Sequence, residues 1–281
     1  MFQQITIIGV GLIGGSFGLA ARKAGFTGRI IGCDREEVLE RAKERDAIDT
    51  GYDDPISAAR GSGLVLLATP VGGIIDLLES APVFPHDALI TDAGSTKSAI
   101  VERARAVLGD AVGERFLPGH PMAGKELGGI DQAEAGLFRN AVWLVTPLPG
   151  QELRGGRIGE FVELVESMGA RVVPLELARH DRLCAWISHL PQMIATALAA
   201  SLEDEFGDDR ELYAIGGRAL REMTRIAASP YSMWRDIALT NTANIQEALL
   251  RLEQRLAHLR ENLRTRELEA EFERAHKFRR S

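Results

Sequence analysis

Short apolar runs alternate with amphipathic stretches along the first 174 residues of the chain. The runs are rich in aliphatic and β-branched residues, which predicts strands at Ile5–Ile8, Arg29–Cys33, Leu64–Ala68, Leu89–Thr91, Phe116–Leu117, Ala141–Thr146 and Arg171–Pro174. The stretches between them, several of which begin at a proline or a hydroxyl residue, predict helices at Leu12–Ala24, Pro55–Ala59, Gly72–Leu78, Lys97–Leu108 and Glu152–Met168. This alternation is typical of an α/β domain with a mainly parallel, doubly wound sheet, and it leaves the strand order open.

The pattern changes after Pro174, where strand-like runs become rare and helical periodicity continues to the end of the chain. We therefore expect two domains, an α/β domain over residues 1–176 and an all-helical domain over residues 177–281. In the second domain, Pro191 interrupts a helical run over Asp181–Leu202. Proline should kink this helix, because it lacks the amide hydrogen and clashes with the preceding turn.

Aliphatic residues recur at heptad spacing in the second domain, in steps of four and three, at Ile245, Leu249, Leu252, Leu256, Leu259 and Leu263. This spacing predicts a helix with one apolar stripe. The stripe can pack on its own domain or form a seam between two subunits, and both can hold at once. Because a helical domain of about 100 residues has little surface to cover such a stripe, we expect a homodimer.

Composition limits the class of protein. With 281 residues, 45% of them hydrophobic, the chain can bury the cores of about two domains. A net charge of −7, with no basic tract outside a short C-terminal tail, argues against nucleic acid or an anionic membrane as a partner. The two cysteines, Cys33 and Cys184, fall in a predicted strand and a predicted helix, so we expect no disulfide framework and a reducing cytoplasm.

The chain carries no recognisable targeting or membrane segment. The first predicted strand follows the N-terminus almost at once, without a basic segment and an apolar signal core. No apolar run reaches the ~20 residues needed to span a bilayer. We therefore expect neither export nor membrane insertion.

A dinucleotide fingerprint opens the chain. The first predicted strand leads into Gly9-x-Gly11-x-x-Gly14, with Leu12 and Ile13 between the last two glycines, and then into a helix. Gly9 permits the tight turn, Gly11 lets a pyrophosphate approach the backbone, and Gly14 allows the helix to pack on the strand. The alternative is a glycine-rich turn in another α/β protein, but the agreement of strand, glycines and helix favours a Rossmann domain.

Two further positions bear on the cofactor. Asp34 ends the second predicted strand, 20 residues after Gly14, where an acidic residue can bind the ribose hydroxyls of the adenosine. The neighbouring Arg35 would suit a 2′-phosphate, whereas Asp34 would repel it. We therefore expect NAD, with NADP as a possible substitute, and we expect Thr69 and Pro70 to lie under the cofactor unless they form a simple turn.

The loops after the strands are expected to hold the chemistry, because ligands of doubly wound sheets bind outside the carboxyl ends of the strands. One loop carries Ser95 and Thr96 within Asp92–Lys97, and another places His120 between Gly119 and Pro121. A lone histidine on a loop is more often solvated than catalytic, but this loop should face the nicotinamide. His120 is thus a candidate base, and at ordinary basicity it would make activity fall below roughly pH 6.5.

The whole chain resembles the prephenate and arogenate dehydrogenases, the cyclohexadienyl dehydrogenases of tyrosine biosynthesis. The resemblance rests on several motifs in the same order, namely Gly9-Val10-Gly11-Leu12-Ile13-Gly14-Gly15-Ser16, Asp92-Ala93-Gly94-Ser95-Thr96-Lys97, Gly119-His120-Pro121-Met122-Ala123-Gly124, Ser188-His189-Leu190-Pro191, Thr224-Arg225-Ile226-Ala227 and Trp234-Arg235-Asp236. It implies an NAD-dependent oxidative decarboxylation of prephenate or arogenate. It also implies dimers joined through the helical domains.

The resemblance implies roles for particular residues. His120 looks like the histidine that accepts the proton of the ring hydroxyl, and Ser95 like the serine that hydrogen-bonds this hydroxyl or orients the histidine. Arg225 resembles the arginine that binds a substrate carboxylate. Glu126 and His189 match positions near the mouth of the pocket, although each has a structural alternative, an ion pair for Glu126 and helix packing for His189.

Two positions depart from the family pattern as the resemblance implies it. Lys125 stands where a small hydroxyl residue is common, and Gln192 where many relatives have a histidine. Both could line the side-chain end of the substrate, which leaves the choice between prephenate and arogenate open. A lysine there would favour an anionic group.

Other functions remain as alternatives. A β-hydroxyacid dehydrogenase or a pyrroline-5-carboxylate reductase also combines a Rossmann half with a helical half, but the His120 loop argues against the former, which uses a helix lysine. A catalytically silent NAD-binding protein would not need His120, Ser95 and Arg225. His180 and Cys184 stand four residues apart, but two ligands do not make a metal site, so we expect no metal.

Overall fold

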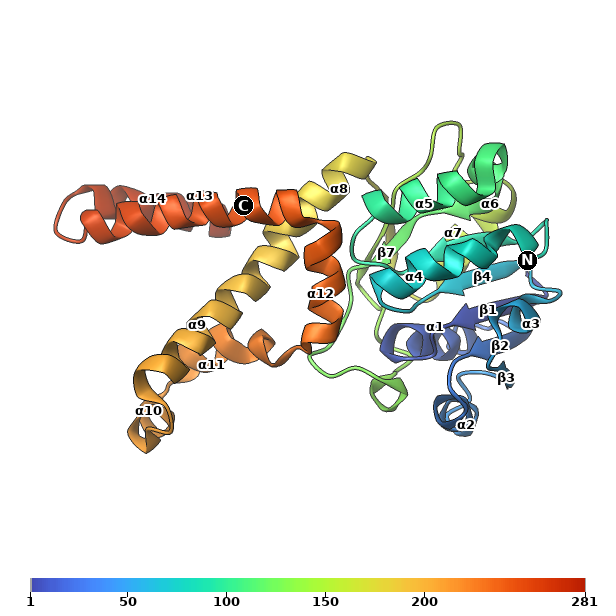
Figure 1. The fold of residues 1–281 in the computed structure, drawn as a ribbon, viewed down its shortest axis with the longest axis horizontal. Coiled ribbons are helices and arrows are strands. Elements are labelled where there is room, and N and C mark those ends of the chain that lie inside the picture. Colours follow the sequence, from blue (N-terminus) through green and yellow to red (C-terminus); the bar gives the residue numbers. More distant parts are fainter. Residues whose placement is uncertain (1, 281) are drawn as a thin grey trace.

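A parallel six-stranded sheet forms the centre of the first half of the molecule (Figure 1). The computed structural model describes residues 2–280. Its strands, in the order β3-β2-β1-β4-β5-β6, are β1 Gln4–Ile8, β2 Arg29–Cys33, β3 Thr50–Tyr52, β4 Leu64–Leu67, β5 Leu89–Asp92 and β6 Phe116–Leu117. The predicted doubly wound sheet is confirmed, and its carboxyl edge carries the loops that the sequence singled out.

A second sheet of three strands extends this domain toward the helical half. Its order is β7 Gly119–Pro121, β8 Val142–Val145 and β9 Arg171–Pro174, with β7 antiparallel to β8. His120 pairs with Leu144, so it lies in a short strand and not in the loop that we expected. The glycine and proline that flank His120 are typical of a turn, which is why the sequence does not reveal a strand of this length.

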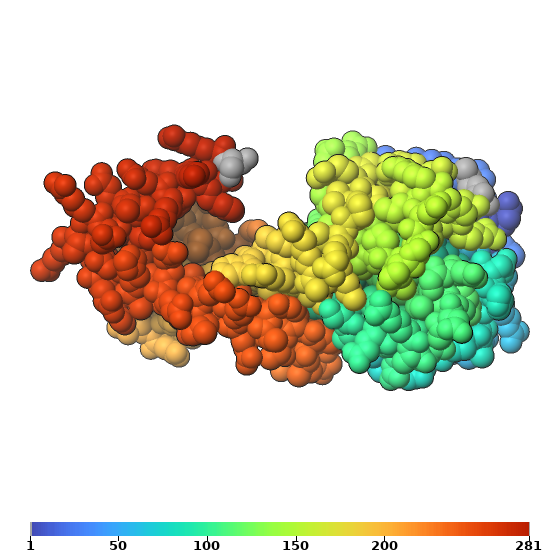
Figure 2. Space-filling model, turned by 90° about the horizontal axis from the view of Figure 1, so that it is seen from above, coloured from blue at the N-terminus to red at the C-terminus, as the bar shows by residue number. Residues whose placement is uncertain are grey.

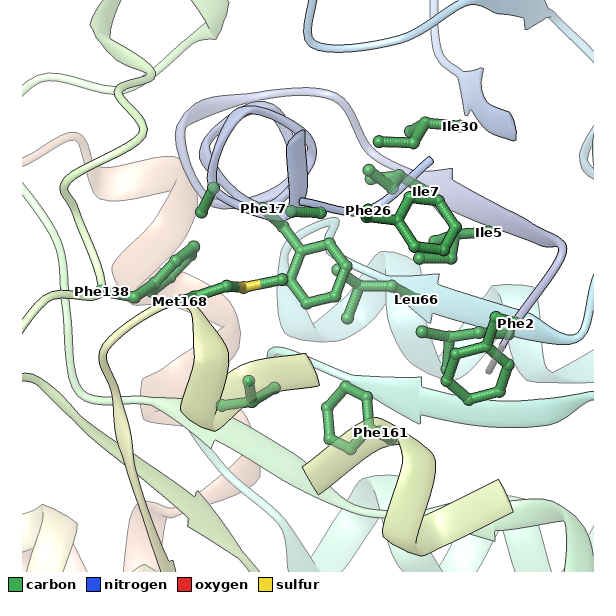
Figure 3. Close-up of a cluster of buried hydrophobic side chains, with 14 of the residues drawn as sticks. Phe2, Ile5, Ile7, Phe17, Phe26, Ile30, Leu66, Phe138, Phe161 and Met168 are labelled. Atoms are coloured by element: carbon green, nitrogen blue, oxygen red, sulfur yellow. The ribbon is translucent and has the colours of Figure 1, made fainter. Parts of the chain in front are cut away.

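Helices cover both faces of the sheets, and their apolar sides form the core. They are α1 Leu12–Lys23, α2 Glu36–Glu44, α3 Pro55–Ala59, α4 Val71–Leu77, α5 Ser98–Leu108, α6 Val112–Arg115 and α7 Gly156–Ser167. Figure 3 shows three of the core phenylalanines, Phe17 of α1, Phe161 of α7 and Phe138. All three rings pack on the fully buried Trp143, and Phe17 and Phe161 meet it edge to face. This aromatic group fastens the second sheet to α1 and thereby fixes the position of β7.

The second half is entirely helical among the described residues and extends away from the sheets (Figures 1 and 2). Its elements are α8 Leu177–Cys184, a π-helical turn Ala185–His189, α9 Leu190–Phe206, α10 Arg210–Ile215, α11 Arg218–Thr224, a 3-10 turn Arg225–Ala228, α12 Tyr231–Thr240, α13 Thr242–Glu261 and α14 Glu267–Arg280. Helices α8 and α12 contact the first domain, whereas α13 and α14 lie side by side at the far end, where Arg255 pairs with Glu271. The site must therefore form where α8 and α12 meet the strand ends.

The interruption expected at Pro191 takes the form of a π-helical turn just before it. The amide of Leu190 donates to the carbonyl of Ala185, five residues earlier. A wider turn of this kind accommodates the missing donor and the ring of proline without breaking the helix. As a result α8 and α9 form one continuous helix, and His189 projects from the widened turn.

This continuous helix, Leu177–Phe206, has a length and mean hydropathy that by themselves would allow it to cross a membrane. The sequence did not suggest this, because His180, Asp181 and Arg182 interrupt its apolar run. In the structure His180 and Asp181 are buried against the first domain, while Ile187 and Phe206 are exposed. The helix therefore acts as a packing helix with one face left uncovered in the single chain.

The heptad stripe is buried at its beginning and exposed at its end. Ile245 packs with Ala185 and Ile237 in a small core, whereas the side chains of Leu256 and Leu263 are 54% and 64% exposed. Helix α13 ends at Glu261, so Leu263 lies beyond the helix that we expected to contain it. The distal part of the stripe thus leaves apolar surface for another partner.

The glycine fingerprint gives a direct test of the packing of α1 on β1. A Cβ atom on Gly14 would lie 2.0 Å from the carbonyl oxygen of Gly9, whereas one on Gly11 would meet nothing within 4 Å. Forcing an atom into such a contact typically costs about 1–3 kcal/mol. Gly14→Ala should lower the free energy of unfolding by at least this amount in urea denaturation, and Gly11→Ala should change it much less. Equal stability of the two variants would contradict the proposed packing.

Candidate active site

The glycine turn after β1 is shaped for a phosphate group. Gly9 has a φ of +93°, and a side chain there would collide with the backbone of Ala68 and Thr69. Gly11 borders open space, and α1 begins at Leu12 without a side-chain cap on its first amides. The first backbone amides of α1 therefore remain available to an anion, as the fingerprint predicts. Leu12 and Ile13, which follow Gly11, are half-buried.

Asp34 lies against this turn. One carboxylate oxygen accepts the amide of Val10 at 2.8 Å, and the other accepts the amide of Arg35 at 2.8 Å. Asp34 is half-buried and the side chain of Arg35 is exposed. The backbone of Thr69, just after β4, lies next to Gly9, and Pro70 follows it before α4. The structure therefore brings Asp34 and Thr69 to the glycine turn that the sequence assigned to the dinucleotide.

A buried ion pair joins the segments that carry the candidate residues Ser95 and His120. Lys97 pairs with Asp92, and both side chains are fully buried. Asp92 also accepts the amides of Gly94 at 2.8 Å and of Gly119 at 3.1 Å, and the ammonium of Lys97 donates to the carbonyl of Gly119 at 2.8 Å. The loop that carries Ser95 is thus tied to the first residue of β7, one position before His120.

His120 ends a chain of hydrogen bonds that crosses into the helical domain. Its Nδ1 lies 3.0 Å from Nε2 of His180, and Nδ1 of His180 lies 2.9 Å from a carboxylate oxygen of Asp181. Asp181 also accepts the amides of Lys97 and Ser98 at the start of α5, at 2.7 and 2.9 Å. Burial alone would raise the pKa of Asp181, but these hydrogen bonds lower it to about 2, so the carboxylate is ionised.

This order of acceptors determines where the protons lie. An ionised Asp181 accepts the Nδ1 proton of His180, which leaves Nε2 of His180 as an acceptor. His120 must then donate its own Nδ1 proton, and its Nε2 keeps a free lone pair. Burial, together with His180 and Lys97, also holds the pKa of His120 well below 6.5. His120 is therefore a neutral imidazole that can accept a proton at Nε2.

Sequence reasoning missed His180 and Asp181 as partners of His120. We considered His180 only as a metal ligand, and Asp181 only as the start of a helical run. The contact between His120 and His180 spans 60 residues, and no local pattern reveals it. The sequence shows only that His180 and Asp181 are adjacent and lie just after the expected domain boundary.

His189 has one ring nitrogen without a partner among the described residues. The side chain is fully buried, its Nδ1 lies 3.2 Å from the amide nitrogen of Asn241, and its ring packs edge to face on Trp234. Nε2 has no hydrogen-bond partner. Burial lowers the pKa of His189 to about 4, so the ring is neutral. His189 thus has the expected packing role and also a buried nitrogen that can form a hydrogen bond with a ligand. The side-chain amide of the buried Gln192, by contrast, already donates a hydrogen bond to the hydroxyl of Thr196 at 3.2 Å.

The remaining expected residues occupy the edge of the site. Arg225, in the 3-10 turn after α11, pairs with Glu126 from the first domain, and the arginine side chain is 61% exposed. Lys125 turns away, because its ammonium pairs with Glu134 at 3.1 Å and donates to the carbonyl of Gln132 at 2.9 Å. Its charge is thus already neutralised on its own loop, which weakens the expectation that it selects an anionic substrate group.

Both halves of the chain match models of one protein family. The prephenate dehydrogenase nucleotide-binding domain matches residues 17–174, and the prephenate dehydrogenase dimerization domain matches residues 176–278. The two matched regions correspond to the Rossmann-type half and the helical half of the structure, which meet at His120. The chain belongs to the prephenate dehydrogenase family.

Individual relatives agree with this assignment. The chain is 36% identical to the prephenate dehydrogenase of Bacillus subtilis over 252 residues and 34% identical to that of Lactococcus lactis over 241 residues. These matches cover 87% and 85% of this chain but 66% and 65% of the relatives, slightly under two thirds of their length. The crystal structure of prephenate dehydrogenase from Aquifex aeolicus with hydroxyphenyl propionate and NAD+ superimposes with a TM-score of 0.87 at 31% identity, covering 99% of this chain and 97% of that one.

The buried ion pair can be tested by removing its charges separately and together. Lys97→Met should leave Asp92 as an uncompensated buried charge and destabilise the fold by about 3–5 kcal/mol. The double variant Asp92→Asn with Lys97→Met removes both charges, so it should recover a large part of this loss in urea denaturation. A double variant no more stable than Lys97→Met would contradict the view that the pair acts mainly by mutual neutralisation.

Proposed function

We propose that this protein catalyses the NAD-dependent oxidative decarboxylation of prephenate to 4-hydroxyphenylpyruvate and carbon dioxide, as a soluble enzyme of the cytoplasm. The observation that carries the proposal is the chain from Asp181 through His180 to His120, which leaves a neutral base at the strand edge of a dinucleotide domain. Family membership supports the substrate class. The buried free cysteines suit a reducing compartment.

The residues around the glycine turn fit a dinucleotide. Gly11 leaves room for the pyrophosphate, the open N-terminus of α1 provides amide donors, and Asp34 ends β2 where the ribose hydroxyls would lie. The carboxylate of Asp34 also disfavours a 2′-phosphate, which supports NAD over NADP. Bound NAD supplies the hydride acceptor.

His120 supplies the proton acceptor. The ring carbon that bears the hydroxyl gives up a hydride, the hydroxyl gives its proton to Nε2 of His120, and the ring carboxylate leaves as carbon dioxide, so that the ring becomes aromatic. The hydrogen bond from Nδ1 to His180 holds the imidazole in the required tautomer and spreads the positive charge that develops toward Asp181. Ser95 is proposed to hydrogen-bond the same hydroxyl or to orient His120.

Arg225 is proposed to bind a substrate carboxylate by its forked guanidinium. In the structure it pairs with Glu126 and is largely exposed, so a carboxylate can replace or join that partner at little desolvation cost. Nε2 of His189, which has no partner within residues 2–280, and the side chain of Gln192 are proposed to contact the rest of the substrate. The prephenate dehydrogenases among the relatives favour prephenate over arogenate. Of the two residues that we expected to line the side-chain end of the substrate, Lys125 is already paired with Glu134.

Initial rates with prephenate and arogenate, each with NAD and NADP, test the proposal. We expect reduction of NAD with prephenate at the highest kcat/KM, and a fall in turnover of at least ~10² in His120→Asn, because asparagine cannot accept the proton. NAD affinity should stay unchanged in this variant. Absence of dinucleotide reduction with either substrate, or near-normal turnover of His120→Asn, would refute the proposal.

The pH profile should reflect the lowered pKa of His120. A base of ordinary basicity would lose activity below roughly pH 6.5, as we first expected, but the buried His120 stays neutral to a lower pH. Turnover should therefore persist as the pH falls through 6.5 and decline only at more acidic values, with full recovery when the enzyme returns to neutral pH. A reversible midpoint at or above about pH 6.5 would contradict the burial of the base.

We further propose that the protein is a homodimer joined through its helical half. Ile187, Phe206 and Leu256 are between 47% and 60% exposed, on the long helix α8–α9 and on α13. Leu256→Glu should put a carboxylate on this apolar surface and shift the particle to a monomer or an aggregate in light scattering. Gln246→Glu adds the same charge at an exposed polar position of α13 and should remain a dimer. A monomeric wild type, or a dimeric Leu256→Glu, would exclude this part of α13 as an interface.

A further inference from the structure

Cys184 adds a sulfur atom to the pair of histidines behind the proposed base. Its Sγ lies 3.7 Å from Nε2 of His180 and 3.9 Å from Nδ1 of His120, and the two ring nitrogens are 3.0 Å apart. His180 and Cys184 are fully buried, and His120 is 8% exposed. In the sequence, His180 and Cys184 gave only two possible metal ligands, four residues apart. The fold places His120 beside them as a third.

These three distances resemble the edges of a tetrahedral metal site. Zinc binds histidine nitrogen at about 2.0–2.1 Å and cysteine sulfur at about 2.3 Å, so neighbouring ligand atoms of a tetrahedron lie roughly 3.3–3.6 Å apart. Each observed separation differs from this range by a few tenths of an ångström, which small side-chain rotations can supply. Two imidazoles and one thiolate are donors that zinc and similar borderline-soft ions favour.

The surroundings of the cluster also suit a metal. Nδ1 of His180 already donates to Asp181, and this carboxylate-histidine arrangement orients metal-binding imidazoles and strengthens them as ligands. Lys97 is a nearby cation, but Asp92 pairs with it directly. Cys184 has no assigned part in the proposed reaction, so its position is not explained by catalysis.

We propose that His120, His180 and Cys184 form a binding site for a borderline-soft divalent cation such as Zn²⁺, and that binding inhibits the enzyme. The thiol of Cys184 loses its proton to solvent, and the proton on Nδ1 of His120 moves to Nε2 as the metal takes the Nδ1 lone pair. His120 then carries a hydrogen where it should accept one. This inhibition depends on the proposed function, whereas metal binding does not.

Cobalt and zinc test the two parts separately on metal-free full-length protein. Co²⁺ should give the intense visible bands of a tetrahedral site and a sulfur-to-cobalt charge-transfer band in the wild type. Zn²⁺ should displace the cobalt and inhibit dinucleotide reduction, and a chelator should restore the rate. Cys184→Ala should keep basal activity, lose the charge-transfer band and raise the inhibitory zinc concentration at least ~10-fold. Cys33→Ala, which removes the other buried cysteine, should behave like the wild type.

Two results would overturn the site. One is a wild type without a charge-transfer band at saturating cobalt. The other is zinc inhibition of Cys184→Ala at the same concentration as in the wild type, which would place the metal elsewhere. If Cys184→Ala does not fold, Cys184→Ser serves in its place. A charge-transfer band in a protein that reduces no dinucleotide would support the metal site while refuting the proposed function.

Discussion

The carboxylate of Asp181 is the interaction on which the site depends. It accepts two amides at the start of α5 in the first domain and the imidazole of His180 on its own helix, while the Asp181 carbonyl accepts the side-chain amide of Asn241. Hydrogen bonds to a charged group are each typically worth about 1.5–3 kcal/mol. One residue therefore joins the two domains and sets the proton positions of the proposed base. A second hydrogen bond joins the same two domains: the backbone amide of Gly72 in α4 donates to the carboxylate of Asp236 in α12 at 3.0 Å.

Burial gives the site its chemical character. Two carboxylates and one ammonium are enclosed around His120, and such charges are tolerated only because each is paired or fully hydrogen-bonded. Burial, followed by His180 and then Lys97, lowers the pKa of His120, so the ring stays neutral and can accept a proton. Through its ion pair with Asp92, Lys97 also fixes β7 relative to β5. The same group thus serves structure and electrostatics.

Features with a local cause could be predicted from the sequence. The glycines at positions 9 and 14 are required by a positive φ and by close packing of helix on strand, and both constraints leave a readable spacing. The sheet and the position of Asp34 beside the glycine turn followed from such local patterns, whereas the short strand that carries His120 did not. The roles of His180, Asp181 and Cys184 did not, because they arise from contacts between residues at least 60 positions apart. Lys125 was misleading for a different reason: its partner Glu134 is close in sequence, but the two residues lie in a loop whose path the sequence does not give.

Asp181, acting through His180, keeps His120 with its proton on Nδ1 and a free lone pair on Nε2. Nitrogen-15 NMR of histidine-labelled protein at neutral pH reports this directly, because protonated and unprotonated ring nitrogens have well-separated shifts. The His120 signals can be assigned by their loss in His120→Asn. We expect a neutral His120 ring with a protonated Nδ1 and an unprotonated Nε2. A ring with its proton on Nε2, or one protonated on both nitrogens, would contradict it.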